Sequence, residues 1–314
     1  MTHTIAEHPR TIPIRVQRDL ARAITSIENG YATLAEASAT LPARTESAGA
    51  YVIGVTGAPG AGKSTLVDRL IEAYRATGET VAVIAVDPSS PFTHGAVLGD
   101  RVRMQRHSGD EGVFIRSMAS RESGGGLAPA THDAIALAAH AGFDVIVVET
   151  VGVGQVELEI VGVADTVAVV TVPALGDSVQ TIKAGLTEIA DLFVVNMADR
   201  PGANRTALDL KHMVRESGKH IAVLQTVASE GTGIGEVVRA LDEARAHPAG
   251  NAERAVRFAV VRSVRDAAVR HAFEMLDGEA GRDVFSRLRS GELNRTEARD
   301  ALVAQILGEV HRAD

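Results

Sequence analysis

Hydrophobic and polar residues follow two different periods along the chain. From Ile14 to Leu41 apolar residues recur every three to four positions, with a break at Asn29-Gly30, and this spacing predicts two consecutive helices. From residue 51 the pattern changes to short, uninterrupted apolar runs that are rich in β-branched residues and end in Gly, Pro or polar residues. The runs are Tyr51–Thr56, Val81–Val86, Phe143–Glu149, Thr166–Val172 and Leu192–Asn196.

Runs that are apolar on both faces are typical of strands inside a parallel sheet that helices cover. Pieces of buried helix give similar runs and are the alternative. Amphipathic stretches alternate with the runs, as in successive strand–helix–strand units, and predict an α/β fold with a mostly parallel, doubly wound sheet. These stretches are Lys63–Thr77, Leu127–Ala141, Ala203–Ser217 and Ile234–Ala246.

Beyond Pro248 no further strand is predicted. Asn251–Leu276 has the spacing of one long amphipathic helix, and a second helix is expected from Asn294 or Thr296 to Val310. This tail is apolar enough to pack either on its own domain or on a partner. We therefore expect a helical N-terminal extension over residues 1–50, a nucleotide-binding domain over residues 51–248 and a helical region over residues 249–314.

Composition excludes several classes. The 314 residues, 45% hydrophobic and 23% charged, are typical of a globular protein, and no apolar run reaches the roughly 18 residues of a membrane span. No secretory signal is evident, and the absence of cysteine excludes disulfides and thiolate metal sites, so we expect a cytoplasmic protein. A net charge of −8 and 3% aromatic residues argue against a nucleic-acid partner.

The strongest chemical signal is a phosphate-binding loop between the first run and the first amphipathic stretch. Its sequence, G-A-P-G-A-G-K-S, has the G-x-x-x-x-G-K-S pattern in its required strand–loop–helix context. Backbone N–H groups of such a loop bind phosphate oxygens, Lys63 adds charge at the β and γ phosphates, and the Ser64 hydroxyl binds Mg²⁺. The predicted nucleotide contacts are Gly57, Ala58, Pro59, Gly60, Ala61, Gly62, Lys63, Ser64 and Thr65.

Acidic residues after later runs are candidates for the metal site. Glu149 and Asp87 each end an apolar run, so their carboxylates are expected near Ser64 around Mg²⁺. The Gly152 N–H is expected to contact the γ-phosphate, and Asp100 to orient the attacking water or accept its proton. Taken singly, Asp87 and Asp100 also fit helix caps or turn residues. The candidate catalytic residues are Lys63, Asp100, Glu149 and Gly152.

A base-recognition motif follows the fifth run. Asn196-Met197-Ala198-Asp199 resembles the N-K-x-D sequence of GTPases, in which the Asp carboxylate accepts hydrogen bonds from guanine N1–H and the exocyclic amine. Adenine lacks both donors, so Asp199 predicts GTP and GDP as ligands, unless the motif only caps the next helix. Met197 keeps the apolar cover of the usual lysine but not its ammonium group, which predicts weakened affinity. Val227 and Ala228 are expected behind the base.

Four segments together resemble one family, the MeaB/ArgK-type GTPases, bacterial relatives of the human methylmalonic aciduria type A protein. The resemblance extends from about residue 14 to residue 248. It implies a P-loop NTPase of the SIMIBI class and a homodimer built through the C-terminal helices. It also implies a Mg²⁺-dependent GTPase that is a chaperone of an adenosylcobalamin-dependent acyl-CoA mutase, methylmalonyl-CoA mutase, gating cofactor loading and protecting the mutase. The segments are G-A-P-G-A-G-K-S, D-P-S-S-P-F-T-H-G-A-V-L-G-D-R-V-R-M, E-T-V-G-V-G-Q and K-A-G-L-T-E-I-A-D-L-F-V-V-N-M-A-D.

The resemblance also implies two switch segments, the one after Asp87 and the loop containing Gly152, and a third, mobile segment, Pro173–Ser178 with Lys183 beyond it. The chain departs from the family pattern within or near these segments and at the base motif. The departures are Met197 for lysine, His94 for glycine, Leu175 and Ser178 in the third segment, and Arg121–Gly124 in place of R-G-H-L.

Three other activities are alternatives. An ATPase or kinase linked to lysine/arginine/ornithine transport carries a related family label, and Asp199 argues against it. A nickel-insertion GTPase depends on Cys and His clusters, whereas this chain has no Cys and 11 scattered His. A scaffold that binds nucleotide without hydrolysing it is the non-enzymatic alternative.

Overall fold

The structure is a computed structural model, and it describes part of the chain. By its internal contacts the chain divides into two compact units, Met1–Ala255 and Val256–Asp314, which are described separately below. The described residues are 9–42, 49–87, 105–119, 127–128, 130–150, 155–173, 186–247, 260, 264 and 278–310.

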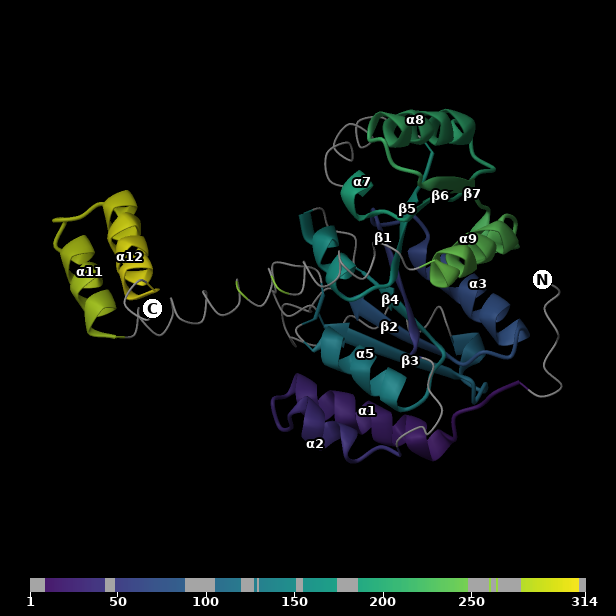
Figure 1. The fold of residues 1–314 in the computed structure, drawn as a ribbon, viewed down its shortest axis with the longest axis horizontal. Helices are drawn as coiled ribbons and strands as arrows, with labels where there is room; N and C mark the ends of the chain where they lie inside the picture. Colours follow the sequence, from purple (N-terminus) through teal and green to yellow (C-terminus); the bar gives the residue numbers. More distant parts are fainter. Residues whose placement is uncertain are drawn as a thin grey trace. The chain divides into compact units, whose positions relative to one another are not determined.

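A seven-stranded parallel sheet forms the centre of the first unit, with the strand order β3-β2-β4-β1-β5-β6-β7 (Figure 1). The predicted parallel sheet is confirmed, and its five predicted strands are β1, β2, β4, β5 and β6. The strands are β1 (Tyr51–Gly57), β2 (Val81–Asp87), β3 (Val113–Ala119), β4 (Val145–Glu149), β5 (Thr166–Thr171), β6 (Leu192–Val195) and β7 (Ala222–Gln225).

The two strands that the hydrophobic pattern missed, β3 and β7, lie at the two ends of the strand order. Three central residues of β3, among them Arg116 and Ser117, are only half-buried, and no residue of the four in β7 is fully buried. An edge strand has one neighbouring strand and less cover from helices, so it need not be apolar on both faces. The criterion of uninterrupted apolar runs therefore detects only the interior strands.

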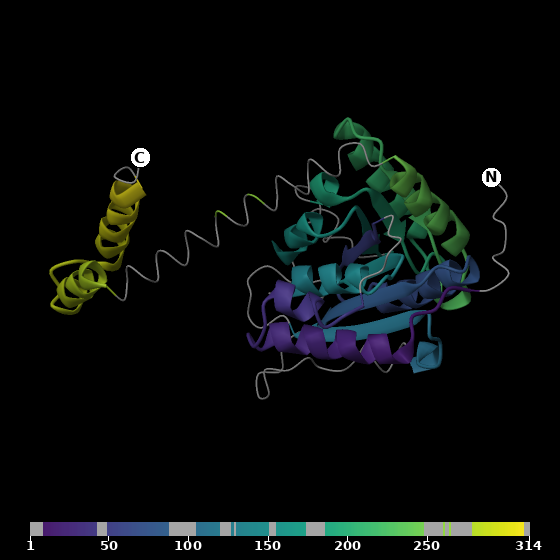
Figure 2. The ribbon, with the colours of Figure 1, turned by 60° about the horizontal axis from the view of Figure 1, so that its bottom comes forward.

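Helices cover the sheet on both faces. The core on one face combines alternate residues of the strands, such as Ile53 and Val147, with Leu70 of α3 and Leu241 of α9. Helix α5 packs on β2 and β4, and Figure 2 shows α1 running alongside α5. The helices are α1 (Ile14–Glu28), α2 (Leu34–Ser38), α3 (Lys63–Ala76), α5 (Thr131–His140), α7 (Leu186–Ile189), α8 (Ala203–Glu216) and α9 (Ile234–Ala246), with 3₁₀ turns η1 (Gln105–His107), η2 (Gln155–Gly162) and η3 (Ala228–Glu230).

The two predicted N-terminal helices are α1 and α2, and the predicted break separates them. Gly30 has φ +70°, a conformation that favours glycine. Thr33 caps the N-terminus of α2 in a capping box: its side chain accepts a hydrogen bond from the Glu36 N–H, and its own N–H donates to the Glu36 carboxylate. Leu20 and Ile24 of α1 are buried. The apolar side of α1 therefore attaches the extension to the sheet domain through α5.

Three aspartates fix the edge of the sheet at which the strands begin. Each lies one residue before a strand and accepts a hydrogen bond from a backbone N–H at the start of a neighbouring strand. These N–H groups would otherwise be unpaired, since the ladder begins there. The pairs are Asp144 with Thr80 (2.9 Å), Asp165 with Val52 (2.8 Å) and Asp191 with Val167 (2.8 Å).

The second unit contains a helical hairpin of α11 (Glu279–Arg289) and α12 (Arg295–Val310). Val284 and Ala298 are buried, whereas Phe285 and Val303 are exposed. The predicted helix ending at Val310 is confirmed, while α11 was not predicted. Of the predicted helix Asn251–Leu276 the structure describes only two residues, at 260 and 264, both helical.

Candidate functional site

The phosphate-binding loop connects β1 to α3 at the edge where the strands end. Gly57 has φ +133°, and a Cβ there would lie 1.9 Å from the Val170 carbonyl oxygen of β5. Gly62, the residue before α3, has φ +82°, and a Cβ there would lie 2.4 Å from Asn196 Nδ2. These two glycines are therefore required by both backbone conformation and space.

Lys63 is placed inside this loop. Its side chain is 7% exposed, and Nζ donates hydrogen bonds to the carbonyl oxygens of Gly57 (2.8 Å) and Ala58 (3.1 Å). A buried ammonium group requires such partners, since loss of hydration is costly. The loop therefore holds the charge of Lys63 where the predicted phosphates would bind.

Ser64 and Glu149 come together as the sequence predicted. Ser64 Oγ donates to Glu149 Oε1 at 2.7 Å, and both side chains are buried. Glu149 ends β4 beside Val55 of β1, and Asp87 ends β2, two residues beyond the partner of Glu149 in the β2–β4 register. The backbones of all three candidate metal residues thus reach one edge of the sheet; nothing is described of the Asp87 side chain.

The chemistry of this donor set fits Mg²⁺, a hard cation that prefers hydroxyl, carboxylate, phosphate and water oxygens. Within the described ranges no three His, Cys, Asp or Glu side chains form a ready-made metal cluster. Mg²⁺ commonly keeps several waters and is bound through one or two carboxylates plus substrate phosphates, so a sparse protein donor set is the expected one.

Asn196 connects the phosphate loop to the loop that was expected behind the base. It is 2% exposed; its Nδ2 donates to the Ala61 carbonyl oxygen (2.9 Å), while its Oδ1 accepts from Thr226 Oγ1 and the Ala228 N–H, both at 3.1 Å. The alternative that the motif caps the next helix is wrong, because α8 begins at Ala203 with Gly202 before it. The buried Asn196 side chain therefore holds the phosphate loop and the loop at Ala228 together.

Met197 adopts φ +56°, the one non-glycine residue with positive φ in the described part of the chain. Its Cε lies 3.8 Å from the position that a Cβ on Gly62 would occupy, so the side chain extends to the phosphate loop. A left-handed conformation costs a non-glycine residue about 1–2 kcal/mol. Asp199, two residues further, is exposed at the same edge, as a base-binding carboxylate needs to be.

Two neighbouring residues of α3 make contacts that no sequence pattern predicts. Arg69 donates hydrogen bonds to two carbonyl oxygens of η3, and Asp68 binds Arg106 and His107 of η1. Charged residues on the outer side of a helix are usually solvated, and no local pattern distinguishes these two. Both residues bind segments that are distant from α3 in the sequence, and only the structure shows these contacts.

Several predicted residues lie outside the described residues. These are Asp100 and Gly152 among the site candidates, and His94, Arg121–Gly124, Leu175, Ser178 and Lys183 among the departures and mobile segments.

A parallel sheet with helices on both faces and a G-x-x-x-x-G-K-S loop between β1 and α3 define a P-loop nucleoside triphosphatase. The sequence model of the family described as methylmalonyl-CoA mutase-associated GTPase MeaB matches residues 20–277. The chain belongs to this family and is a P-loop GTPase, which confirms the predicted resemblance.

Known proteins agree with this assignment. A putative GTPase of Pyrococcus abyssi is 56% identical over 236 residues, which are 73% of this chain and 72% of that protein. The fused isobutyryl-CoA mutase of Cupriavidus metallidurans is 38% identical over 204 residues, 64% of this chain and 18% of that protein. A crystal structure described as an LAO/AO transport system kinase has a TM-score of 0.59 at 26% identity, covering 92% of this chain and 98% of its own.

Proposed function

We propose that this GTPase is a chaperone of an adenosylcobalamin-dependent acyl-CoA mutase, methylmalonyl-CoA mutase, whose cofactor loading it gates and which it protects from inactivation. One observation carries the proposal beyond the family description. A segment similar to this chain is part of a protein named as a fused isobutyryl-CoA mutase, so a related sequence and a mutase share one polypeptide in Cupriavidus metallidurans.

In the proposed mechanism the phosphate loop and Lys63 bind the β and γ phosphates, and the fixed hydrogen-bond donors stabilise the charge that develops during hydrolysis. Ser64, Asp87 and Glu149 would hold Mg²⁺, which offsets phosphate charge when bound. Asp100 would orient the attacking water, and the Gly152 N–H would contact the γ-phosphate. The buried hydrogen bond between Ser64 and Glu149 supports the proposal that these two residues lie together at the Mg²⁺ site.

At the other end of the nucleotide, Asp199 would accept two hydrogen bonds from guanine, with Val227 and Ala228 behind the base. The support is the buried Asn196, which holds the Ala228 N–H at 3.1 Å and thereby places this loop beside the motif. Met197 would cover the base face from the phosphate-loop side.

The C-terminal unit would form the homodimer, and we expect the protein in the cytoplasm. The unit exposes the large apolar side chains Phe285 and Val303, 44% and 46% exposed, which a helix–helix interface would bury. Among the described residues no helix is long and apolar enough to cross a bilayer.

The proposal is tested by GTP turnover measured with the protein alone and with purified methylmalonyl-CoA mutase or isobutyryl-CoA mutase, each with and without adenosylcobalamin. We expect slow turnover of GTP alone, no turnover of ATP, and faster turnover when the mutase is added. Unchanged GTP turnover with every mutase would contradict the chaperone role. ATP turnover equal to that of GTP would contradict the base assignment.

A substitution tests the base site directly. Asp199→Asn replaces an acceptor by an amide that can donate to the 2-oxo group of xanthine. We expect guanine affinity to fall about 100-fold, from two lost charge-assisted hydrogen bonds, and xanthine nucleotides to bind better. Asp209→Asn is the matched control, because Asp209 lies on α8 in a surface ion pair with Arg205.

A further inference from the structure

Helix α3 contacts both ends of the proposed nucleotide site. Its first two residues, Lys63 and Ser64, belong to the phosphate loop. Arg69, further along the helix, contacts η3, the 3₁₀ turn that begins at Ala228. Its Nε donates to the Ala228 carbonyl oxygen at 2.9 Å, and its NH2 group donates to the Ser229 carbonyl oxygen at 2.6 Å. Two donors of one planar guanidinium thus bind two consecutive carbonyl groups.

The same turn is held from the opposite side. Asn196 accepts a hydrogen bond from the Ala228 N–H, and it donates to the Ala61 carbonyl oxygen of the phosphate loop. Ala228 is therefore fixed at its N–H by Asn196 and at its carbonyl by Arg69, and it is 1% exposed. The phosphate loop, Asn196, η3 and α3 form a closed ring of contacts.

An arginine suits this position for a geometric reason. Its planar fork presents several N–H donors in a fixed arrangement, whereas a lysine ammonium is a point charge at the end of a flexible stem. The third donor group of Arg69, NH1, donates to Glu72 Oε2 at 2.9 Å, so each of the three guanidinium nitrogens has a partner. The side chain of Arg69 is 26% exposed, so part of its charge is shielded from water.

We propose that Arg69 is a positioning residue for the nucleotide base. It fastens the base-side loop to the helix that carries Lys63 and Ser64, so that the phosphate and base subsites keep a constant separation. The inference rests on the proposed function, because it takes the η3 loop to be the wall of the guanine site. Without Arg69, nucleotide binding must itself order this loop, and that ordering reduces affinity.

The proposal predicts a change in how well the protein distinguishes guanine from inosine nucleotides. Loosening the loop lets the base shift relative to Asp199, so the two hydrogen bonds that Asp199 would accept from guanine weaken while the phosphate contacts stay in place. Guanine nucleotides should then lose more affinity than inosine nucleotides, which lack the exocyclic amine, and KM for GTP should rise while kcat at saturation stays nearly unchanged. A residue that only stabilised the fold would lower the melting temperature without changing the ratio of GTP to ITP affinity.

The test compares Arg69→Gln, Arg69→Lys and Glu72→Gln in the full-length protein. Binding of GDP, IDP and slowly hydrolysed GTP and ITP analogues is measured by calorimetry, together with thermal unfolding and steady-state GTP turnover. Glu72→Gln is the matched control: it removes the ion pairs of Glu72 with Arg69 and Arg106 and leaves the two carbonyl contacts of Arg69 intact.

We expect Arg69→Gln to lower GTP-analogue affinity about tenfold and to reduce the guanine-to-inosine ratio at least about threefold, from the loss of two hydrogen bonds. Arg69→Lys should fall between Arg69→Gln and wild type, and Glu72→Gln should bind within about twofold of wild type. If Arg69→Gln does not fold, the same ratio in Arg69→Lys decides.

An unchanged ratio in a folded Arg69 variant overturns the inference. Asp199→Asn in the same assays separates this failure from that of the proposed function. If Asp199→Asn lowers guanine affinity and the Arg69 variants do not, only the positioning role is wrong. If neither substitution changes guanine affinity, the base site itself has been misassigned.

Discussion

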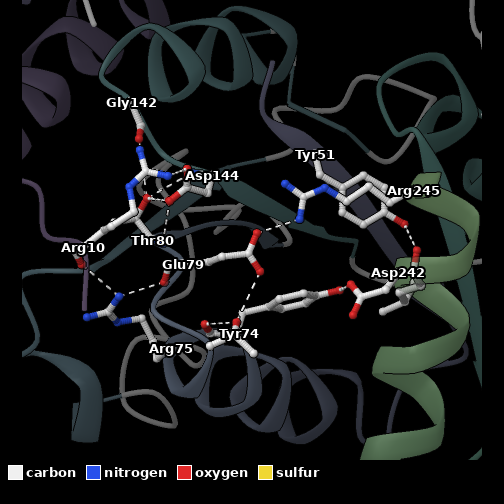
Figure 3. A network of polar contacts seen from close by, with 12 residues as sticks. Arg10, Tyr51, Tyr74, Arg75, Glu79, Thr80, Gly142, Asp144, Asp242 and Arg245 are labelled. Atoms are coloured by element: carbon white, nitrogen blue, oxygen red, sulfur yellow. Dashed lines mark hydrogen bonds and ion pairs between the residues drawn. The ribbon is translucent and has the colours of Figure 1, made fainter. Parts of the chain in front are cut away.

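The sheet has one edge where its parallel strands begin and an opposite edge where they end, and the polar groups at these two edges have different partners. Figure 3 shows the edge where the strands begin, at which polar side chains bind one another. Arg245 pairs with Glu79 at 2.6 Å and stacks over the ring of Tyr51, 5.2 Å from its centre. The Tyr51 hydroxyl donates to the Leu241 carbonyl oxygen at 2.8 Å, which ties β1 to α9.

The tyrosines of this edge are held in their neutral form. Burial raises the pKa of Tyr51 and of Tyr74 well above the ordinary value for a phenol. Both hydroxyls therefore remain hydrogen-bond donors at every pH at which the protein works, and Tyr74 donates to Asp242 Oδ1. The hydrogen bonds and ion pairs at this edge connect α3, α9 and the N-terminal segment and stabilise the fold.

At the opposite edge, where the strands end, lie the residues of the proposed nucleotide site. Asp199 is exposed, and Gly62 and Met197 adopt positive φ around the phosphate loop. Ligands of open α/β sheets bind outside the carboxyl ends of the strands, where helices begin and their N–H groups point outward. The comparison teaches that polar side chains bind one another where the strands begin, whereas we propose that those where the strands end bind the nucleotide.

Below, the edge where the strands begin is called the structural edge and the edge where they end the functional edge. The largest expected effect tests the functional edge. Lys63→Ala removes the ammonium group that the phosphate loop holds at the carbonyl oxygens of Gly57 and Ala58. We expect kcat/KM for GTP to fall by about 10³, or roughly 4 kcal/mol, with little change in stability. Steady-state phosphate release and thermal unfolding measure the two effects.

Lys219→Ala is the control for this substitution. Lys219 Nζ also donates to a backbone carbonyl oxygen, that of Thr187 at 2.8 Å, but this carbonyl belongs to α7 and not to the phosphate loop. Its turnover should equal that of the wild type. If Lys63→Ala stays within tenfold of wild type, the functional edge has been placed incorrectly.

The next effect tests the structural edge. Asp144→Ala removes an acceptor of the Thr80 N–H (2.9 Å) and Thr80 Oγ1 (2.8 Å) and the ion-pair partner of Arg10. We expect the free energy of unfolding to fall by about 2–3 kcal/mol, because buried donors lose their partner, while the folded protein binds GTP as before. Urea unfolding and calorimetry give the two numbers.

Asp209→Ala, which breaks an exposed ion pair on α8, should cost less than about 0.5 kcal/mol and serves as the control. The distinction between the edges fails if Asp144→Ala weakens GTP binding without destabilising the protein.

A smaller effect is expected at Met197. Met197→Lys would restore an ammonium group on a side chain that already extends to the phosphate loop. One charge-assisted hydrogen bond to a loop carbonyl should tighten GTP and GDP binding about three- to tenfold, near 1 kcal/mol. Met197→Leu keeps an apolar cover without a charge and should leave affinity unchanged. Equal gains in both variants would show that the charge is irrelevant.

The smallest effect concerns pH and the structural edge. Burial raises the pKa of Asp165, so the native state binds a proton at higher pH than the unfolded chain does. The ionised carboxyl therefore destabilises the native state at neutral pH, and this destabilisation disappears as the pH falls through the raised pKa of the folded state. Asp165→Asn should be more stable than wild type at pH 7, by less than about 1 kcal/mol after solvent screening, and this advantage should shrink toward pH 4.

Asp110 provides the opposite slope. Its hydrogen bonds to Arg75 lower the pKa of the carboxyl, so its stabilisation is present above the unfolded pKa and is lost as the pH falls below about 4. Urea unfolding of Asp165→Asn and Asp110→Asn between pH 3 and pH 7 should therefore give differences from wild type that change in opposite directions. Parallel slopes would contradict the assigned causes.

Local patterns in the sequence determined the interior strands, the helices between them and the phosphate loop. A buried strand needs apolar residues on both faces, and the loop needs glycines at fixed spacing before a lysine, so each leaves its signature within a few residues. Gly57, Gly62 and Lys63 lie in the loop after β1, and Glu149, at the end of β4, accepts a hydrogen bond from Ser64; their binding roles stay predictions.

Only the tertiary structure decided how the base side is assembled. Asn196 reaches Ala61 across 135 residues of sequence, and Arg69 reaches Ala228 across 159. The edge strands β3 and β7 and the network of Arg245 with Glu79 likewise depend on neighbours that are distant in the chain. Such contacts follow from how the sheet is wound, and an arginine or asparagine that makes them has no local periodicity to distinguish it from a solvated one.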